Sequence, residues 1–424
     1  MKNYQPRIAD ALLRRKLEGK GAVLIEGAKW CGKTTTAEQL AQSILYLSDP
    51  EKSQQYLDMA SLAPRKLLEG KTPRLLDEWQ LAPQLWDTVR FEVDHRDGLG
   101  LFILTGSTVP PSAAVLHHTG TGRIARLKMR PMSLFESGES RGEISLGKLF
   151  AETVPPTASN SLSLEELAFL VCRGGWPLAT QLRQTVALDQ AFDYCDAVIH
   201  SDASRIDNVA KDPERVRRLM QSYARLQGTQ AATTVIRADM RANDKAVLSQ
   251  DTIHSYLAAL ERIFVIEDLP AWNPNLRSKA AIRTSDTRFF VDPSIATASL
   301  GLGPNDLMDD LTTFGLLFEA LCIRDLRIYA EANDGQVYHY KDSSGLECDA
   351  VVHLRNGAYG LIEIKLGGTR LIEEGVVTLN KLANQIDPAR MKKPAFKMVL
   401  TGTGEYAYCR NDGILVVPIG CLRE

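Results

Sequence analysis

Hydrophobic and polar positions divide the chain into segments with different periods. Short apolar runs at residues 22–26, 74–76 and 101–104 each end in polar residues, a pattern typical of buried strands. Residues 35–45 instead space Ala37, Leu40, Ala41 and Ile44 three or four positions apart, which predicts an amphipathic helix after the first strand. The order of strand, loop, helix and further strands predicts an α/β domain at the start of the chain.

Helical periodicity dominates the middle of the chain. Residues 161–182 and 187–206 predict a helical lid that follows a connector rich in Pro, Ser and Thr at 153–163. Residues 215–228, 229–240 and 248–264 predict three more helices, the last with Ser249 as its N-cap, and 265–272 predicts a strand pair. Three helices followed by a β wing is the order of a winged helix.

The last third of the chain returns to strands. An amphipathic helix is expected at 312–331, followed by strands at 347–354 and 361–365 joined by a short turn, and by apolar runs at 396–402 and 413–419. Asp349 then lies on one strand and Glu363 and Lys365 on its neighbour. Because side chains alternate along a strand, Glu363 and Lys365 share one face.

Length and composition indicate a globular protein with several domains. The 424 residues exceed what one hydrophobic core holds, and we predict domains at 1–155, 156–210, 211–295 and 296–424. The net charge of −2 gives no global attraction to nucleic acid. Seven scattered cysteines without CxxC pairs suit reduced thiols, and neither a secretion signal nor a membrane-spanning run is found, so a cytoplasmic location is expected.

The stretch GAKWCGKT at 27–34 fits the phosphate-binding pattern GxxxxGK[ST] between a strand and a helix. Its glycines let consecutive backbone N–H groups face phosphate oxygens, Lys33 adds charge for the β and γ phosphates, and Thr34 offers a hydroxyl to Mg²⁺. The expected cofactor-binding residues of the loop are Gly27, Ala28, Lys29, Trp30, Cys31, Gly32, Lys33, Thr34 and Thr35. The alternative is an unrelated glycine turn. No NKxD-like guanine-reading segment is found, which favours ATP over GTP.

Two adjacent carboxylates follow the second strand, in RLLDEWQ. At the tip of this strand Asp77 would hold the Mg²⁺ shell, and Glu78 would polarise the attacking water. The alternative is an ordinary acidic turn.

These motifs, in this order, resemble the AAA+-like ATP-binding proteins of bacteria and archaea that carry a C-terminal domain of unknown function (DUF4143-type, PD-(D/E)xK nuclease-like). The resemblance rests on YQPRIADALL, the phosphate loop, DEWQLAP, FILTGS, GRIARLKMRPMSLFE and RGGWP, and covers nearly the whole chain. It implies a parallel-sheet ATPase domain, a helical lid with a winged helix, and a restriction-endonuclease-like C-terminal domain. Lys29 stands where relatives usually have arginine, which keeps the charge.

Further nucleotide contacts follow from the AAA+ resemblance. Thr105 and Ser107, at the third strand tip, would contact the γ-phosphate. Arg123 or Arg126 could serve as an arginine finger, in the same subunit or in a neighbour's site, although a surface arginine is the simpler interpretation of each. A finger supplied in trans would require an oligomer.

The predicted winged helix is the first of two regions that could bind nucleic acid. In a winged helix, the third helix would face bases with Gln250, Thr252, His254 and Ser255, but it is poor in basic residues. Arg215, Arg217, Arg218 and Arg225 could add charge, or could form a solvated face.

The C-terminal constellation matches the PD-(D/E)xK arrangement. Asp349 and Glu363 would hold Mg²⁺ beside a phosphate, Lys365 would activate water, and Glu319 on the preceding helix would complete the metal shell. The alternative is a salt bridge between Glu363 and Lys365 at a sheet edge.

The sequence thus favours an ATPase coupled to a nuclease-like domain that acts on DNA or RNA. A nucleotide-dependent switch or scaffold for protein partners, with a silent C-terminal domain, stays open, as does an ATPase that binds nucleic acid without cutting it.

Overall fold

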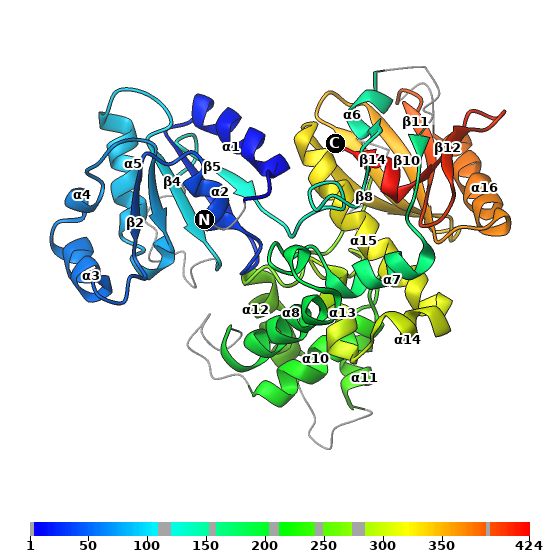
Figure 1. Cartoon of the computed structure of the whole chain (residues 1–424), viewed down its shortest axis with the longest axis horizontal. Helices are drawn as coiled ribbons and strands as arrows, with labels where there is room; N and C mark the ends of the chain where they lie inside the picture. The colour runs from blue at the N-terminus through cyan, green and yellow to red at the C-terminus, as the bar shows by residue number, and fades with distance from the viewer. Residues whose placement is uncertain are drawn as a thin grey trace. The chain divides into compact units, whose positions relative to one another are not determined.

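The computed structural model describes residues 4–108, 120–151, 158–202, 212–241, 249–273, 285–386 and 391–424. Its described residues divide into two compact units. The first runs to Pro131 and includes the later stretch Ala258–Val265, and the second contains most of the remainder from Met132 on. Both units combine helices with a sheet (Figure 1), so the predicted mixed α/β class is confirmed. The four predicted domain ranges stay a prediction, but residues 132–151 group with the second unit.

The first unit is built on a parallel sheet with the strand order β2-β3-β4-β1-β5. Its strands are β1 (Ala22–Glu26), β2 (Ser43–Tyr46), β3 (Arg74–Asp77), β4 (Phe102–Gly106) and β5 (Ile124–Lys128). Every neighbouring pair is parallel, with Leu24 opposite both Leu104 and Arg126. The carboxyl ends of the strands therefore meet at one edge, and the loop 27–32 follows β1 at that edge.

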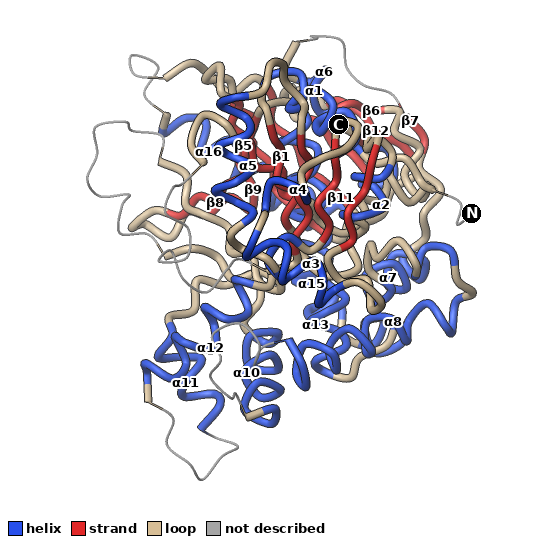
Figure 2. Tube along the Cα trace, turned by 90° about the vertical axis from the view of Figure 1, so that its left-hand side faces the viewer, coloured by secondary structure: helices blue, strands red, loops and turns tan. Residues whose placement is uncertain are grey.

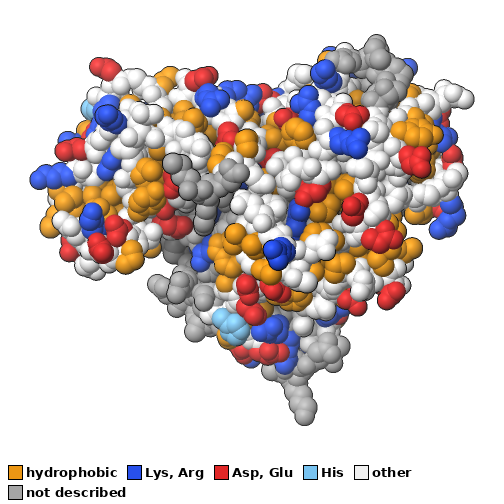
Figure 3. Space-filling view, viewed as in Figure 1, with side chains coloured by type: hydrophobic (Ala, Val, Ile, Leu, Met, Phe, Trp, Pro, Cys, Tyr) orange, Lys and Arg blue, Asp and Glu red, His pale blue; other side chains and the backbone are white. Residues whose placement is uncertain are grey.

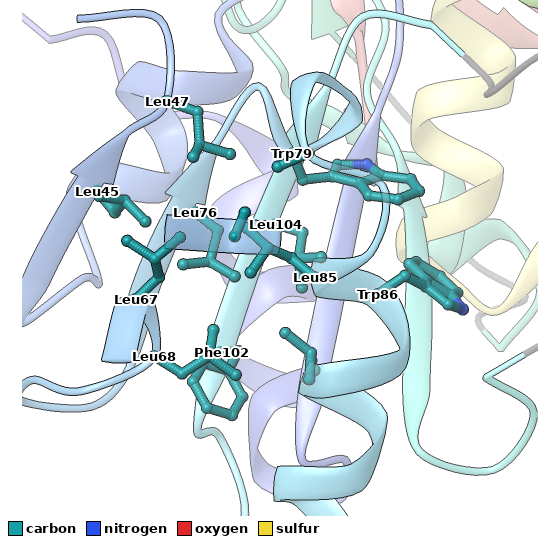
Figure 4. Close-up of a cluster of buried hydrophobic side chains, with 14 of the residues drawn as sticks. Leu45, Leu47, Leu67, Leu68, Leu76, Trp79, Leu85, Trp86, Phe102 and Leu104 are labelled. Atoms are coloured by element: carbon teal, nitrogen blue, oxygen red, sulfur yellow. The ribbon is translucent and has the colours of Figure 1, made fainter. Parts of the chain in front are cut away.

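Alternate residues of these strands feed two separate hydrophobic layers. The helices of this unit are α1 (Ile8–Gly19), α2 (Lys33–Glu38), α3 (Ser53–Leu62), α4 (Pro64–Leu67) and α5 (Leu85–His95). Val23, Ile25 and Ile103 pack with α1 and α2 on one face. Leu24 and Leu104 face the other layer, where Trp79, Leu85 and Trp86 cover the sheet (Figure 4). The period of two along each strand produces this separation.

The predicted helix at 35–45 is wrong in its second half. Helix α2 ends at Glu38, and Ser43–Tyr46 forms the edge strand β2, which pairs with β3. Within it Leu45 is buried whereas Ile44 and Tyr46 are exposed, an alternation of period two. The spacing of Leu40, Ala41 and Ile44 fits a helix equally well, so parallel pairing with a distant strand decided the outcome.

Helices fill the middle of the chain, as predicted. They are α7 (Leu164–Arg173), α8 (Gln184–Ala197), α10 (Pro213–Arg225), α11 (Thr233–Arg241), α12 (Gln250–Arg262), α13 (Pro293–Leu300) and α14 (Pro304–Asp309). Helix α13 packs against α7, α8 and α10, in a region whose described residues form mainly helices (Figure 2). The predicted N-cap holds, because the Ser249 hydroxyl accepts the Thr252 N–H at 3.1 Å.

The expected strand pair after α12 is reduced to isolated bridges. Ile266 pairs with Phe290 and Leu269 with Thr287 in antiparallel fashion, while Ala271 pairs with His339. Three helices followed by antiparallel bridges agree with the predicted order of elements. The winged-helix assignment itself stays a prediction.

The end of the chain forms a second, mixed sheet with the order β7-β12-β13-β11-β10-β9-β8. Its strands are β7 (Ala158–Ser159), β8 (Gly335–Lys341), β9 (Glu347–Leu354), β10 (Tyr359–Lys365), β11 (Phe396–Thr401), β12 (Tyr406–Cys409) and β13 (Leu415–Pro418). Strands β9 and β10 form the predicted antiparallel hairpin, and β10 runs parallel to β11. Helices α15 (Leu311–Ala332) and α16 (Thr369–Gln385) contact the sheet, and the small elements α6 (Leu146–Leu149), β6 (Ile144–Ser145) and β14 (Leu422–Arg423) complete the unit.

None of the helices in the described ranges combines the length and the apolar character that a bilayer crossing requires.

Candidate nucleotide site and C-terminal acidic site

The loop between β1 and α2 adopts the backbone that its glycines predict. Gly32 has φ 100°, and Gly27, with φ 157°, approaches the chain so closely that a Cβ there would lie 2.0 Å from the Met129 carbonyl oxygen. Trp30 also has a positive φ, 64°, and the residue is 49% exposed. Left-handed backbone is uncommon in residues other than glycine, because it costs free energy. The surrounding contacts must therefore stabilise this loop in one defined conformation.

Lys33 lies inside this loop. Its ammonium donates to the carbonyl oxygens of Gly27 at 2.9 Å and Ala28 at 2.7 Å, and the residue is only 6% exposed. The carbonyls of the loop thus hold the lysine charge at the centre of the curled backbone. Cys31 is fully buried, with its thiol 3.5 Å from the Met129 carbonyl oxygen, which withholds it from solvent oxidants.

The carboxylate of Asp77 links the first turn of α2 to the ends of β3 and β4. Its Oδ1 atom accepts hydrogen bonds from the hydroxyls of Thr34 and Thr105, both at 2.7 Å, and the residue is 6% exposed. Thr34 follows the loop after β1, Asp77 ends β3, and Thr105 lies on β4. The predicted metal-shell residues Thr34 and Asp77 are therefore neighbours, and their hydroxyl and carboxylate oxygens are hard donors of the kind that Mg²⁺ prefers alongside phosphate oxygens. The donor set fits this cation.

Glu78 follows Asp77 in a left-handed conformation, with φ 55°. Its Oε2 atom accepts hydrogen bonds from the Gln80 amide and, at 3.4 Å, from the Ser107 hydroxyl. The structure thus brings Thr34, Asp77, Glu78, Thr105 and Ser107 together at the edge where the phosphate loop lies.

The two arginines considered as fingers are placed differently. The carbonyl of Arg123 pairs with the Ala22 N–H at the amino end of β1, the sheet edge opposite the loop, and its guanidinium bonds Asp94 at 2.8 Å. Arg126 lies midway along β5 and pairs with Glu26 at 2.9 Å. Both arginines thus form ion pairs with carboxylates that lie outside the loop 27–34.

The sequence patterns did not predict the hydrogen bonds that join the N-terminal segment to the loop. Arg7, only 7% exposed, donates to the carbonyl oxygens of Cys31 and Arg130, both at 2.8 Å. The Tyr4 hydroxyl bonds Asp10 at 2.5 Å and lies 3.0 Å from the Thr36 hydroxyl on α2, and burial raises the pKa of Tyr4. The only signal was a polar YQPR stretch before a helix, and no local pattern pairs it with residues so far along the chain.

The arginines of α10 have carboxylate partners. Arg215 pairs with Asp212, Arg217 with Asp196 and Glu214, Arg218 with Glu214, and Arg225 with Asp239. On α12, Gln250, His254 and Ser255 are exposed and Thr252 is half-buried. The ion pairs favour the solvated-face interpretation of the arginines over phosphate binding.

The second unit brings Asp349, Glu363 and Lys365 into direct contact. The Lys365 ammonium lies 3.0 Å from Asp349 Oδ2 and 2.8 Å from Glu363 Oε2. Asp349 Oδ2 also accepts the Ile364 N–H at 2.7 Å, which links β9 to β10. The predicted hairpin geometry therefore places these three side chains as expected.

Burial changes the protonation chemistry of this cluster. Burial first, and then the charge of Asp349, raise the pKa of Glu363 to about 8. Burial opposes the charge of Lys365, but the carboxylates of Asp349 and Glu363 outweigh it and raise its pKa. Glu319, on α15, has its pKa raised by burial and by Asp349, so it belongs to the same electrostatic group.

A cavity of about 810 Å³ opens beside the cluster. Its lining residues are Ser344, Gly345, Leu346, Glu347, Asp349, Glu363, Lys365, Thr378, Lys381, Asn384 and Gln385. Among the described residues, no three His, Cys, Asp or Glu side chains are grouped so as to hold a metal ion. The expected shell of Glu319, Asp349 and Glu363 is therefore not preformed, because the Lys365 ammonium bonds both Asp349 and Glu363.

Comparisons with known families match one domain near the start of the chain and another near its end. A family described as an AAA domain matches residues 19–137, and a domain of unknown function, DUF4143, matches residues 314–422. The chain is an AAA-domain protein with a C-terminal DUF4143 domain. The predicted combination of an AAA-type domain with a C-terminal DUF4143 domain is thereby confirmed, whereas the nuclease-like character of the second domain stays a prediction. The loop 27–34 lies in the first domain and the acidic cluster in the second. A further domain of unknown function, DUF8612, matches residues 164–306, between these two.

Individual relatives are distant. Two uncharacterized proteins, of Mycobacterium tuberculosis and Mycobacterium bovis, are each 22% identical over 417 residues, which is 97% of this chain and 83% of theirs. Among solved structures, a Walker-type ATPase of Pyrococcus abyssi is 16% identical with a TM-score of 0.43, over 70% of this chain and 96% of that one.

Proposed function

We propose that this AAA-domain protein binds ATP with Mg²⁺ at the loop 27–34 and hydrolyses it. The observation that carries the proposal is the 2.7 Å contact between the Thr34 hydroxyl and Asp77, which are 43 residues apart in sequence. A hydroxyl at the end of a phosphate loop beside a strand-end carboxylate is the pair of oxygen ligands that nucleotide-bound Mg²⁺ uses.

The remaining residues then take complementary roles. Backbone N–H groups of the loop and the Lys33 ammonium would bind the β and γ phosphates. Thr105 and Ser107 would orient Asp77 and Glu78 at the γ-phosphate, and Glu78 would accept a proton from the attacking water. Mg²⁺, when bound, supplies positive charge that stabilises the phosphate oxygens. Arg123 lies at the sheet end opposite the loop, so it would serve as an arginine finger only in the site of a neighbouring copy, whereas Arg126, which pairs with Glu26 directly before the loop, could serve in either site.

The assignment of Glu78 predicts a separation of binding from turnover. Glu78→Gln should bind ATP like the wild type, because the side chain keeps its size, while phosphate release falls about 100-fold or more, as expected when a general base is lost. Glu69→Gln, at an exposed position, is the matched control and should leave phosphate release unchanged. Wild-type turnover in Glu78→Gln would remove this residue from the reaction.

We propose further that the DUF4143 domain binds the phosphate backbone of nucleic acid at the cavity beside Asp349. Support comes from Lys365 and Lys381 at this cavity and from Glu363, whose buried Oε1 atom has no hydrogen-bond partner among the described residues. Protonated below pH about 8, Glu363 could donate to a phosphate oxygen. A shift of Lys365 away from the carboxylates would free Asp349 and Glu363 for Mg²⁺, so cleavage would require that rearrangement.

Incubation of plasmid DNA or RNA with the protein and Mg²⁺ or Mn²⁺ tests this second proposal. Nicking by the wild type that is lost in Asp349→Ala and Lys365→Ala, but kept in the exposed control Asp412→Ala, would support cleavage. Binding that weakens with salt, without nicking, would indicate a nucleic-acid-binding domain. Neither binding nor nicking would instead favour a switch or scaffold for protein partners with a silent C-terminal domain.

A further inference from the structure

The backbone at Glu78 holds an unusual conformation directly beside the phosphate loop. With φ 55° it lies in the left-handed region, which side chains other than glycine adopt at a free-energy cost. This conformation turns the chain out of β3 into the short 3₁₀ helix η1 (Trp79–Leu81). Contacts elsewhere must hold it, and the Glu78 side chain supplies two of them.

Both contacts converge on one oxygen of the carboxylate. The Gln80 amide nitrogen and the Ser107 hydroxyl each donate to Glu78 Oε2, and among the described residues Oε1 accepts no hydrogen bond. The carboxylate is therefore fixed through one oxygen, and the other remains available to accept a proton.

In this arrangement the side-chain oxygen of Gln80 lacks a hydrogen bond within the part of the chain that the structure describes. Its Oε1 atom is buried and accepts no hydrogen bond from any described residue. An amide with both ends satisfied would be the lower-energy choice for a purely structural glutamine. The orientation of Gln80 is thus explained by the hydrogen bond that its nitrogen donates to Glu78, while its oxygen accepts none from the described residues.

The absence of a side chain at Gly106 leaves room for the Gln80 side chain. A Cβ at position 106 would lie 2.9 Å from Gln80 Oε1 and 2.9 Å from the Trp79 ring nitrogen. Trp79 is 2% exposed and packs against Trp86 with ring centroids 5.0 Å apart, so the 3₁₀ turn has little freedom to move. The amide of Gln80 is consequently held between a rigid turn and the end of β4.

We propose that Gln80 is a positioning residue for ATP hydrolysis, which holds Glu78 by its Oε2 atom so that Oε1 receives the proton of the attacking water. The proposal rests on the proposed ATPase function. In that step the water oxygen bonds the γ-phosphorus, the bond to the oxygen bridging the β and γ phosphates breaks, and one water proton passes to Glu78. Gln80 acts only through Glu78 and does not touch the phosphate.

The first test separates turnover from binding. Gln80→Leu removes both polar atoms at similar size and should lower kcat about 100-fold while leaving the KM for ATP unchanged, since orientation of a general base affects the chemical step. Gln84→Leu is the matched control, because the Gln84 amide bonds Ser61 instead, at 3.5 Å, and should leave kcat unchanged. A Gln80→Leu variant with wild-type or increased kcat would overturn the proposal.

A double-mutant cycle distinguishes positioning from general structural support. In a Glu78→Gln background, Gln80→Leu should cause no further loss of kcat, because its target is already gone. An equal additional loss in that background would show that Gln80 supports the fold independently and would overturn the proposal. Gln80→Glu, which keeps the shape but replaces the donor with an acceptor, should repeat the loss of kcat if Gln80→Leu does not fold.

The outcomes also separate this proposal from the function on which it rests. Loss of turnover in Glu78→Gln together with full turnover in both Gln80 variants would overturn the positioning role alone. Absence of ATP turnover in the wild type would overturn the proposed ATPase function itself.

Discussion

One carboxylate, that of Asp77, joins the start of α2 to the ends of two strands of the first sheet. Its Oδ1 atom accepts hydrogen bonds from the hydroxyls of Thr34 and Thr105. One side chain therefore fixes the start of α2 against β3 and β4. Parallel strands bring such residues together although they lie far apart in sequence, because their carboxyl ends share one edge. This is why a strand-end aspartate was sufficient to predict the partner of the phosphate loop.

A second residue, His339 on β8, gives the protein a predicted pH dependence. Burial lowers the pKa of His339, which is 3% exposed. Its ring nitrogens lie 3.2 Å from the Gln230 amide nitrogen and 3.2 Å from the Ser285 carbonyl oxygen. Those contacts suit the neutral ring, which accepts from Gln230 and donates to Ser285.

The sign of the effect follows from proton linkage. As pH falls through about 6.5, an unfolded chain protonates this histidine while the folded chain resists, so the unfolded state binds more protons and the free energy of unfolding decreases. Urea unfolding between pH 7.5 and 5 should therefore show a steeper loss for the wild type than for His339→Gln. The exposed control His254→Gln should follow the wild type, and identical slopes for all three proteins would contradict the assignment.

At the scale of elements, a buried ion network holds the RGGWP turn. Arg324 on α15 bonds Asp292, at the start of α13, at 2.9 Å and the neighbouring Asp325 at 2.7 Å. The second oxygen of Asp325 accepts the Leu134 N–H at 2.9 Å, and Asp292 accepts the Gly175 N–H at 3.0 Å. One network thus ties two helices to the turn 173–177 and to the segment that follows β5 in sequence.

The two glycines of this turn are required by space. A Cβ at Gly174, which has φ 71°, would lie 2.4 Å from Asp292 Oδ1, and one at Gly175 would lie 2.1 Å from the Met132 carbonyl oxygen. The sequence singled out RGGWP only as a motif. Its physical reason is visible once α13 and α15 are packed against it.

Removing the cation of this network should be costly. Arg324→Met leaves Asp292 and Asp325 buried without their partner, and we expect a loss of about 3–5 kcal/mol in the free energy of unfolding of the second unit. Arg355→Met breaks an exposed pair with Asp334 and should change that free energy by less than about 1 kcal/mol. Urea unfolding measures both, and equal effects would contradict the role of burial.

Elements that depend on local pattern were predictable, and those that depend on distant pairing were not. The run Ala22–Glu26 is buried throughout its apolar part and was predicted as a strand. Strand β2 was predicted as helix because Leu40 and Ile44 fit both periods. The roles of Arg7 and Gln80 could not be predicted, because they depend on hydrogen bonds to Cys31 and Glu78. No periodicity in the sequence indicates those contacts.

At the scale of the whole molecule, two chemically different sites lie in two compact units. The proposed nucleotide site belongs to the first, while the cluster of Asp349, Glu363 and Lys365 belongs to the second. The face in Figure 3 carries basic and acidic side chains interspersed, in keeping with the net charge of −2. Any contact with nucleic acid would therefore depend on a local site such as the cavity beside Lys365.

Binding of ATP, as proposed, is the step on which every other proposed role of the first unit depends. Titration calorimetry with ATP and Mg²⁺ tests it most directly, with Lys33→Ala as the variant that lacks the ammonium held by Gly27 and Ala28. We expect a saturable heat with one site per chain for the wild type and none for Lys33→Ala. No heat for the wild type, or equal binding by both proteins, would contradict the account.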